Sequence, residues 1–121
     1  MAKTILTVDD SRTIREMLKA ALLDAGMEVL QAEDGVHGLE VLETCDPDVI
    51  ITDINMPRMD GFGFIEAVRG SDRYRAIPIL VLTTESVDDK KDRARRAGAS
   101  GWIVKPFDPV KLVTAINRVA A

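Results

Sequence analysis

Five short apolar runs alternate with five stretches of helical spacing, and this alternation restricts the fold more than any other feature of the chain. Each run is rich in Ile, Val and Leu and has about the length of a buried strand. The runs predict strands at Thr4–Val8, Glu28–Ala32, Val49–Asp53, Ile79–Thr83 and Trp102–Val104. Such an alternation, with near-continuous apolar strands, predicts an α/β fold with a parallel sheet covered by helices on both faces. The length of 121 residues suits one domain.

Start and stop signals support the helices between these runs. Gly26 predicts the end of the first helix, which carries apolar residues from Ile14 to Ala25. Asp34 predicts an N-cap for the second helix. Asp108 predicts an N-cap for the last helix, with Pro109 in the first helical position.

The fourth helical stretch is unusual because it is almost entirely charged. It opens with a capping sequence, Ser86–Asp89, and offers only Val87, Ala94 and Ala97 for burial. Its acids come first and its bases last, which suits the helix dipole. Because so little apolar area anchors it, we expect this helix to open more easily than the first or last helix.

Charged or hydroxyl side chains stand where four of the predicted strands stop. They are Asp9 with Asp10, Asp53, Thr83 and Lys105. In an open parallel sheet, ligands bind in the crevice outside the carboxyl ends of the strands. These residues come together if the five strands have the doubly wound, flavodoxin-like order 2-1-3-4-5 and are flanked by five helices, with the crevice between the first and third strands.

The resulting pocket would hold three carboxylates, which favours a bound cation. At 4 Å and an effective dielectric constant near 20, each pair of carboxylates repels by about 4 kcal/mol. Mg²⁺ fits such a pocket because it is a hard ion that takes oxygen ligands and shares phosphate oxygens. One His and one Cys provide no cluster suited to zinc.

The same residue types suit phosphoryl transfer. Asp53 ends a central strand, and a carboxylate so placed can act as a nucleophile and form an acyl phosphate. Lys105 supplies a positive charge for the phosphoryl oxygens, and Thr83 supplies a hydroxyl donor. Asn55 can offer its backbone carbonyl to the cation. Little further covalent chemistry is needed, since phosphoryl transfer depends mostly on positioning and charge stabilisation.

Charge and hydropathy limit the possible partners. The net charge of −4 makes nucleic acid an unfavoured partner. No apolar run approaches the roughly 18–20 residues of a membrane span. The start, Met1–Thr4, lacks the apolar segment of a signal peptide, so we expect a cytoplasmic protein without membrane contact. The lone Cys45 excludes an internal disulfide.

Four sequence motifs around these residues give the chain a resemblance to a known family. They are V-D-D-S at Val8–Ser11, T-D-I-N-M-P-R-M-D-G at Thr52–Gly61, L-T-T-E at Leu82–Glu85 and A-G-A-S-G-W-I-V-K-P-F at Ala97–Phe107. Over its whole length the chain resembles the receiver domain of two-component response regulators, and most of all the free-standing CheY-type chemotaxis regulators. Residues 1–121 would then form one receiver domain without an output domain.

The resemblance implies specific roles at the site. Asp53 would accept a phosphoryl group from a phosphohistidine of a CheA-type sensor histidine kinase. Mg²⁺ would be bound by Asp9, Asp10, Asp53 and the carbonyl of Asn55. The Lys105–Pro106 peptide bond would be cis. The protein would catalyse only its own phosphorylation and dephosphorylation, and so would not be an enzyme acting on a separate substrate.

The resemblance also implies a switch and an output. The phosphoryl group would draw Thr83 inward, and an aromatic residue on the fifth strand would follow. That aromatic residue is Trp102 here, where Tyr or Phe is usual, and Thr84 stands where a small Ala is common. The fourth helix, fifth strand and last helix would form the output face of a monomer. Its target would be another protein, such as a flagellar motor switch protein.

Three alternatives remain at this point. The chain could serve as a phosphate sink or in a phosphorelay outside chemotaxis. A phosphohydrolase of the haloacid dehalogenase type would have D-x-D at the nucleophile, whereas Asp53-Ile54-Asn55 lacks the second acid. A flavodoxin-like electron carrier would need a Ser/Thr/Gly-rich phosphate loop, whereas Asp9-Asp10-Ser11 is acidic and would repel a flavin phosphate.

Overall fold

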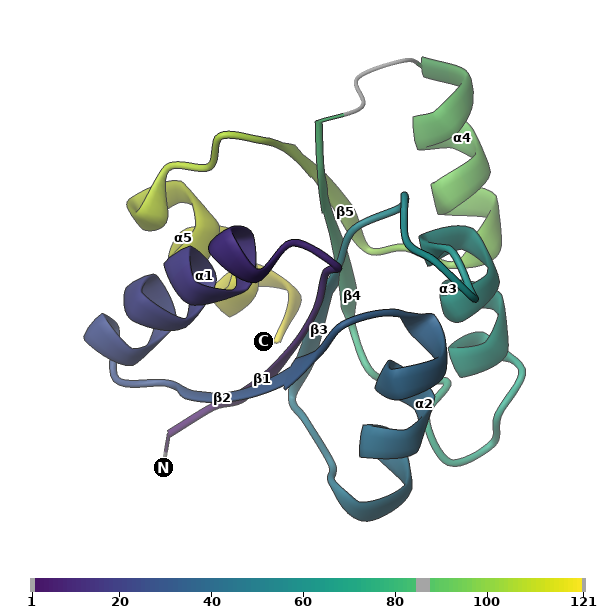
Figure 1. Cartoon of the computed structure of the whole chain (residues 1–121), viewed down its shortest axis with the longest axis horizontal. Coiled ribbons are helices and arrows are strands. Elements are labelled where there is room, and N and C mark those ends of the chain that lie inside the picture. Colours follow the sequence, from purple (N-terminus) through teal and green to yellow (C-terminus); the bar gives the residue numbers. More distant parts are fainter. Residues whose placement is uncertain (1, 85–87, 121) are drawn as a thin grey trace.

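A computed structural model describes residues 2–84 and 88–120, and in these ranges strands and helices alternate as predicted (Figure 1). The strands are β1 (Thr4–Val8), β2 (Glu28–Ala32), β3 (Val49–Thr52), β4 (Ile79–Thr83) and β5 (Gly101–Val104). The helices are α1 (Arg12–Asp24), α2 (Gly35–Thr44), α3 (Gly61–Arg69), α4 (Asp88–Ala97) and α5 (Pro109–Val119). The third strand ends at Thr52, so Asp53 is the first residue after the strand rather than its last residue.

The strands form a parallel sheet in the order β2-β1-β3-β4-β5, which confirms the predicted topology. Strand β1 lies between β2 and β3, so the chain reverses its winding direction there. Helices α1 and α5 cover one face of the sheet, and α2, α3 and α4 cover the other (Figure 1). This arrangement is the doubly wound fold that places a ligand crevice beyond the ends of β1 and β3.

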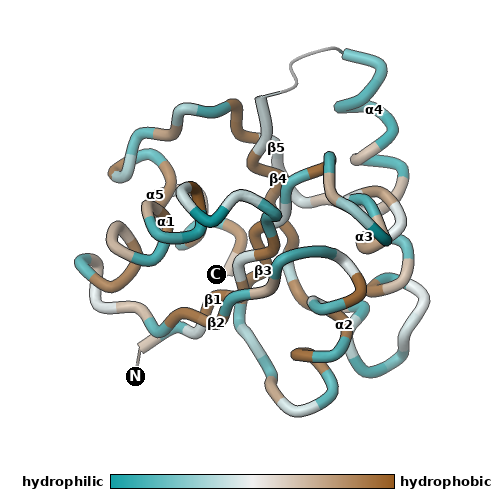
Figure 2. The backbone as a smooth tube through the Cα atoms, in the orientation of Figure 1, coloured by the Kyte–Doolittle hydropathy of each residue, from teal (hydrophilic) through white to brown (hydrophobic). Residues whose placement is uncertain are grey.

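Two apolar clusters fill the space between the sheet and its helices. Leu6 and Val8 of β1 pack in the cluster beneath α2, α3 and α4. Ile5 packs with Leu18 and Leu22 of α1 in the cluster beneath α1 and α5. Because alternate side chains of a central strand enter both clusters, the central strands are mostly apolar, and Figure 2 shows them as a hydrophobic part of the trace.

The predicted helix signals are present in the structure. The Asp34 carboxylate accepts a hydrogen bond from the His37 backbone N–H, and Asp108 accepts from Val110 N–H. Gly26, just beyond α1, has a φ of +81°, a conformation that glycine adopts without the steric cost of a side chain. These contacts set where the helices begin and end relative to the sheet.

Helix α4 has the weak anchorage that its sequence predicts. Within its described residues, Ala94 is the one fully buried side chain. The guanidinium of Arg93 also lies over the ring of Phe62 in α3, 4.1 Å from its centroid, a contact that the sequence did not predict. Ser86 and Val87, which belong to the predicted capping sequence and apolar face, lie outside the described residues. In the described ranges, none of the helices combines the length and apolarity required to cross a membrane.

Candidate functional site

Strand register brings the predicted site residues together at one edge of the sheet. Val8 is paired with Thr52, so Asp9 and Asp53 follow two neighbouring strands at the same level. The backbone N–H of Asp53 donates to Val8 O at 2.9 Å, which fixes the start of the loop that follows β3. The two carboxylates therefore project from backbone held by the sheet.

Strands β4 and β5 bring Lys105 to the same place. Thr83 is paired with Val104, and Lys105 N–H donates to Thr83 O at 2.8 Å. The ammonium Nζ of Lys105 donates to Oδ2 of Asp9 and to Oδ2 of Asp53, both at 2.9 Å. Its side chain is largely buried, so this cation bridges two carboxylates in a partly dehydrated setting. The Lys105–Pro106 bond is cis, as the resemblance implied.

The second carboxylate oxygen of Asp9 and that of Asp53 each accept a hydrogen bond from the backbone. Asp9 Oδ1 accepts from Ser11 N–H at 2.9 Å, and Asp53 Oδ1 accepts from Ile54 N–H at 2.7 Å. Asp53 is 8% exposed, so it is enclosed but still reaches the surface. The orientation of both carboxylates is thus set before any ligand arrives.

The donor set fits a divalent cation. Carboxylate oxygens of Asp9, Asp10 and Asp53 all lie within 4.8 Å of one another, with Asp10 exposed and the other two buried. One ammonium offsets one of the three negative charges, which leaves a charge that Mg²⁺ would neutralise. Hard oxygen donors at the rim of a crevice are what Mg²⁺ requires. We conclude that this acidic group can hold Mg²⁺.

Burial and the ion pairs shift the proton affinities of the site. Burial raises the pKa of Asp9 above its ordinary value, because hydrogen bonds from Lys105 and Ser11 only partly offset the lost hydration. Burial lowers the pKa of Lys105, but its hydrogen bonds to Asp9 and Asp53 outweigh that effect and raise the pKa overall. Lys105 therefore stays charged at neutral pH.

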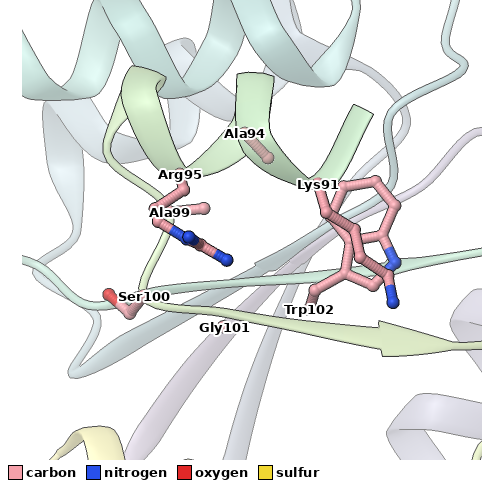
Figure 3. Close-up of a pocket in the computed structure, with 7 residues that line it drawn as sticks. All are labelled: Lys91, Ala94, Arg95, Ala99, Ser100, Gly101 and Trp102. Carbon is pink, nitrogen blue, oxygen red and sulfur yellow. The ribbon is translucent and has the colours of Figure 1, made fainter. Parts of the chain in front are cut away.

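The remaining predicted residues lie on β4, on β5 and in the loop after β3. Thr83 ends β4 and is completely buried, whereas Asn55 lies exposed in the loop that follows Asp53. Trp102 is partly buried on β5, opposite Val81 of β4. Figure 3 shows the Trp102 indole beside Lys91 in a groove between α4 and β5, so movement at this strand would reach the groove.

Two supporting contacts were missed by the sequence interpretation. Arg15 of α1 donates from its guanidinium to the backbone oxygen of Asp9 at 2.6 Å. Arg58 pairs with Asp34 across two loops, although the sequence predicted Asp34 only as a helix cap. Neither arginine follows a strand end, so the pattern that identified the other residues did not include them.

Comparisons with known proteins agree with this geometry. A family model described as the response regulator receiver domain matches residues 5–117. The chain is 44% identical over 117 residues to the chemotaxis protein CheY1 of Helicobacter pylori, covering 95% of this chain and 94% of CheY1. It is 34% identical to a segment of the sensor histidine kinase CheAY of the same species, covering 94% of this chain and 14% of CheAY. The structure of the chemotaxis response regulator CheY4 of Vibrio cholerae superposes with a TM-score of 0.92 at 46% identity, covering 98% of this chain and 99% of that chain.

Proposed function

The chain belongs to the response regulator receiver domain family and is homologous to CheY chemotaxis regulators, and from this we propose that it is a phosphorylation-activated switch whose acceptor is Asp53. The observation that carries the proposal is the bridge from Lys105 to Asp53 and Asp9, beside a third carboxylate. A nucleophile, a fixed cation and a set of metal ligands thereby share one crevice.

In the proposed reaction, a carboxylate oxygen of Asp53 attacks the phosphorus of a phosphohistidine on a sensor kinase. The bond between nitrogen and phosphorus breaks, an oxygen–phosphorus bond forms, and the imidazole nitrogen takes up a proton from water. Lys105 stays next to the new acyl phosphate and balances its added negative charge. Later attack by water on phosphorus returns the carboxylate and releases inorganic phosphate.

Asp9, Asp10, Asp53 and the backbone carbonyl of Asn55 would hold Mg²⁺. When bound, this ion neutralises charge on the carboxylates and on the phosphoryl oxygens. Asp9 is oriented for such a role by Ser11 N–H, and Asp53 by Ile54 N–H. The chain's own backbone therefore sets the direction of two of the proposed ligands.

Switching requires several new contacts at once. Moving a two-state protein from mostly off to mostly on takes about 5.5 kcal/mol of differential interaction. A hydrogen bond to a charged group contributes about 1.5–3 kcal/mol, so the Thr83 hydroxyl alone is insufficient. In our proposal Thr83 and Lys105 bind the phosphoryl oxygens together, and Trp102 and the weakly anchored α4 respond.

The output is proposed to be a protein contact through α4, β5 and α5. A CheA-type histidine kinase is the proposed phosphoryl donor, and similarity to CheAY supports a kinase of this class. A flagellar motor switch protein is a proposed target, with a role as a phosphate sink as the second candidate. We propose that residues 1–121 act as one monomeric receiver domain in the cytoplasm. Its own phosphorylation and dephosphorylation would be its only chemistry, with no separate substrate.

Incubation with acetyl phosphate and Mg²⁺ tests the proposal. We expect one phosphoryl group per chain, seen as a mobility shift on a phosphate-affinity gel that hydroxylamine reverses, together with a change in Trp102 fluorescence. Asp53→Asn should lose both signals, while Asp60→Asn, which changes an exposed helix cap, should keep them. Equal phosphorylation of the wild type and Asp53→Asn would show that the acceptor is another residue.

A further inference from the structure

Arg58, in the loop between β3 and α3, has an unusual backbone conformation. Its φ is +62°, in the left-handed region that side chains other than glycine rarely adopt. Such a conformation is sterically unfavourable for a residue with a Cβ. It therefore persists only where surrounding contacts hold it, and such positions concentrate at functional sites.

Two contacts hold Arg58: Met59 N–H donates to Pro57 O across it at 2.6 Å, and its guanidinium forms a two-pronged ion pair with Asp34. Nε of Arg58 donates to Oδ2 of Asp34 at 2.7 Å, and Nη2 donates to Oδ1 at 3.0 Å. Asp34 is only 2% exposed and also accepts from His37 N–H, so its position is fixed by α2. Arg58 lowers the pKa of Asp34, as does the His37 N–H, so the carboxylate stays charged at neutral pH.

Further backbone contacts attach the same two loops to each other. Gly35 N–H donates to Met59 O at 3.3 Å, and the loops lie side by side at one end of the sheet (Figure 1). A Cβ added at Gly35 would lie 2.8 Å from Met59, so the approach requires glycine. Within the β3–α3 loop, Gly61 N–H donates to Ile54 O at 2.8 Å. The loop is therefore closed at its base and fastened at Arg58 and Met59, with Asn55 in the span between.

We propose that Arg58 and Asp34 are positioning residues, whose ion pair holds the β3–α3 loop in the conformation that presents Asn55 to the cation. This inference rests on the proposed function, because it assigns the pair a role in Mg²⁺ affinity. Neither residue belongs to the acidic group at the site, so the pair acts through the loop backbone. Holding the loop before the cation arrives removes an ordering cost from binding.

Calorimetric titration of the wild type and five variants with Mg²⁺ tests the proposal. Arg58→Gly removes the ion pair while accommodating the positive φ, so it separates the pair from the backbone strain. Asp34→Asn removes the charge but keeps an oxygen that can cap α2. We expect each to weaken Mg²⁺ binding about tenfold, as seen when contacts behind metal ligands are removed. The double variant should bind Mg²⁺ about as tightly as the single variant with the lower Mg²⁺ affinity.

Two further variants separate positioning from general structure. Arg58→Lys keeps the positive charge but lacks the planar guanidinium that makes two hydrogen bonds to Asp34. Its Mg²⁺ affinity should therefore lie between those of the wild type and Arg58→Gly. Arg73→Ala removes an exposed ion pair with Asp46 that does not touch the β3–α3 loop, and its affinity should match the wild type. Urea unfolding of each variant without metal shows that the titrated protein is folded.

The outcomes distinguish this inference from the proposed function. Weaker binding by Arg58→Gly and Asp34→Asn, without additivity, supports the positioning role. Wild-type affinity in both variants overturns this inference and leaves the proposed function intact. Additive losses, or an equal loss in Arg73→Ala, also overturn it, because the effect would not then arise from the pair. Absence of Mg²⁺ binding by the wild type overturns both the inference and the metal role in the proposed function.

Discussion

Nζ of Lys105 lies 2.9 Å from Oδ2 of Asp53, although the two residues are 52 positions apart in the chain. The pair joins the loop after β5 to the loop after β3, and the same ammonium also reaches Asp9. A phosphoryl group on Asp53 would enter a place where a positive charge already stands. The unphosphorylated site therefore has the charge arrangement that the phosphorylated state requires.

Replacing Lys105 by Met should destabilise the metal-free protein. Asp9 and Asp53 would face each other without their shared cation, and loss of one partner from a buried ion pair costs about 3 kcal/mol or more. Mg²⁺ should recover part of this loss, because it neutralises the same carboxylates. Urea unfolding with EDTA and with saturating Mg²⁺ measures both effects; an identical loss in the two conditions would contradict the shared role.

Removing the exposed carboxylate of the acidic group should have opposite effects on stability and on metal binding. Asp10→Ala removes the repulsion between an exposed carboxylate and two buried ones, so the free energy of unfolding without metal should rise. Mg²⁺ affinity should fall. Asp72→Ala, at a highly exposed site, removes the same charge and should leave affinity unchanged. Unaltered Mg²⁺ affinity in Asp10→Ala would remove this residue from the ligand set.

Thr83→Ala should separate phosphorylation from its response. Thr83 is buried at the end of β4, and its hydroxyl is the group we expect to bind the phosphoryl oxygen. The variant should still be phosphorylated by acetyl phosphate, but its Trp102 fluorescence change should be greatly reduced. Thr84→Ala, at the exposed neighbouring position, is the matched control and should keep the change. A full Trp102 response in Thr83→Ala would show that switching takes another route.

Arg93→Ala should loosen α4 while leaving most of the fold intact. The variant loses the contact between the guanidinium and the Phe62 ring, worth about 0.5–1 kcal/mol at a site open to water. Amide hydrogen exchange should accelerate in α4 and stay unchanged in β1 and β3. Arg96→Ala makes the same charge change on an exposed residue of this helix and serves as the comparison. Equal exchange in both variants would show that the ring contact does not anchor α4.

The Asp34 ion pair predicts a pH dependence with a defined sign. Because the folded pKa of Asp34 lies below its ordinary value of 3.8, the ionised group stabilises the folded state above that pH. The contribution is lost as pH falls through the lowered folded pKa. The difference in unfolding free energy between the wild type and Asp34→Asn should therefore be constant near neutral pH and shrink below 3.8. A difference that instead widened in acid would show that the shift has the opposite sign.

The strand order and the meeting of the main site residues could be predicted from sequence because both depend on local patterns. Short apolar runs mark strands, and in a parallel sheet the residues that end those strands share one edge. Asp9, Asp53, Thr83 and Lys105 were found in this way, and the register places them at that edge. Helix starts at Asp34 and Asp108 were predictable for the same reason, since a cap acts on its own first turn.

Side chains that reach across the fold could not be predicted in this way. The sequence does not show that Arg58 meets Asp34, which lies 24 positions earlier in the chain and beside it in space. The stacking of Arg93 on Phe62 likewise depends on how α4 packs against α3. Local periodicity therefore determined the framework and the placement of Asp53 at the end of a central strand. The contacts of Arg58 and Arg93 form only after the helices have packed on the sheet. Their partners are distant in the chain, so the order of residues does not reveal them.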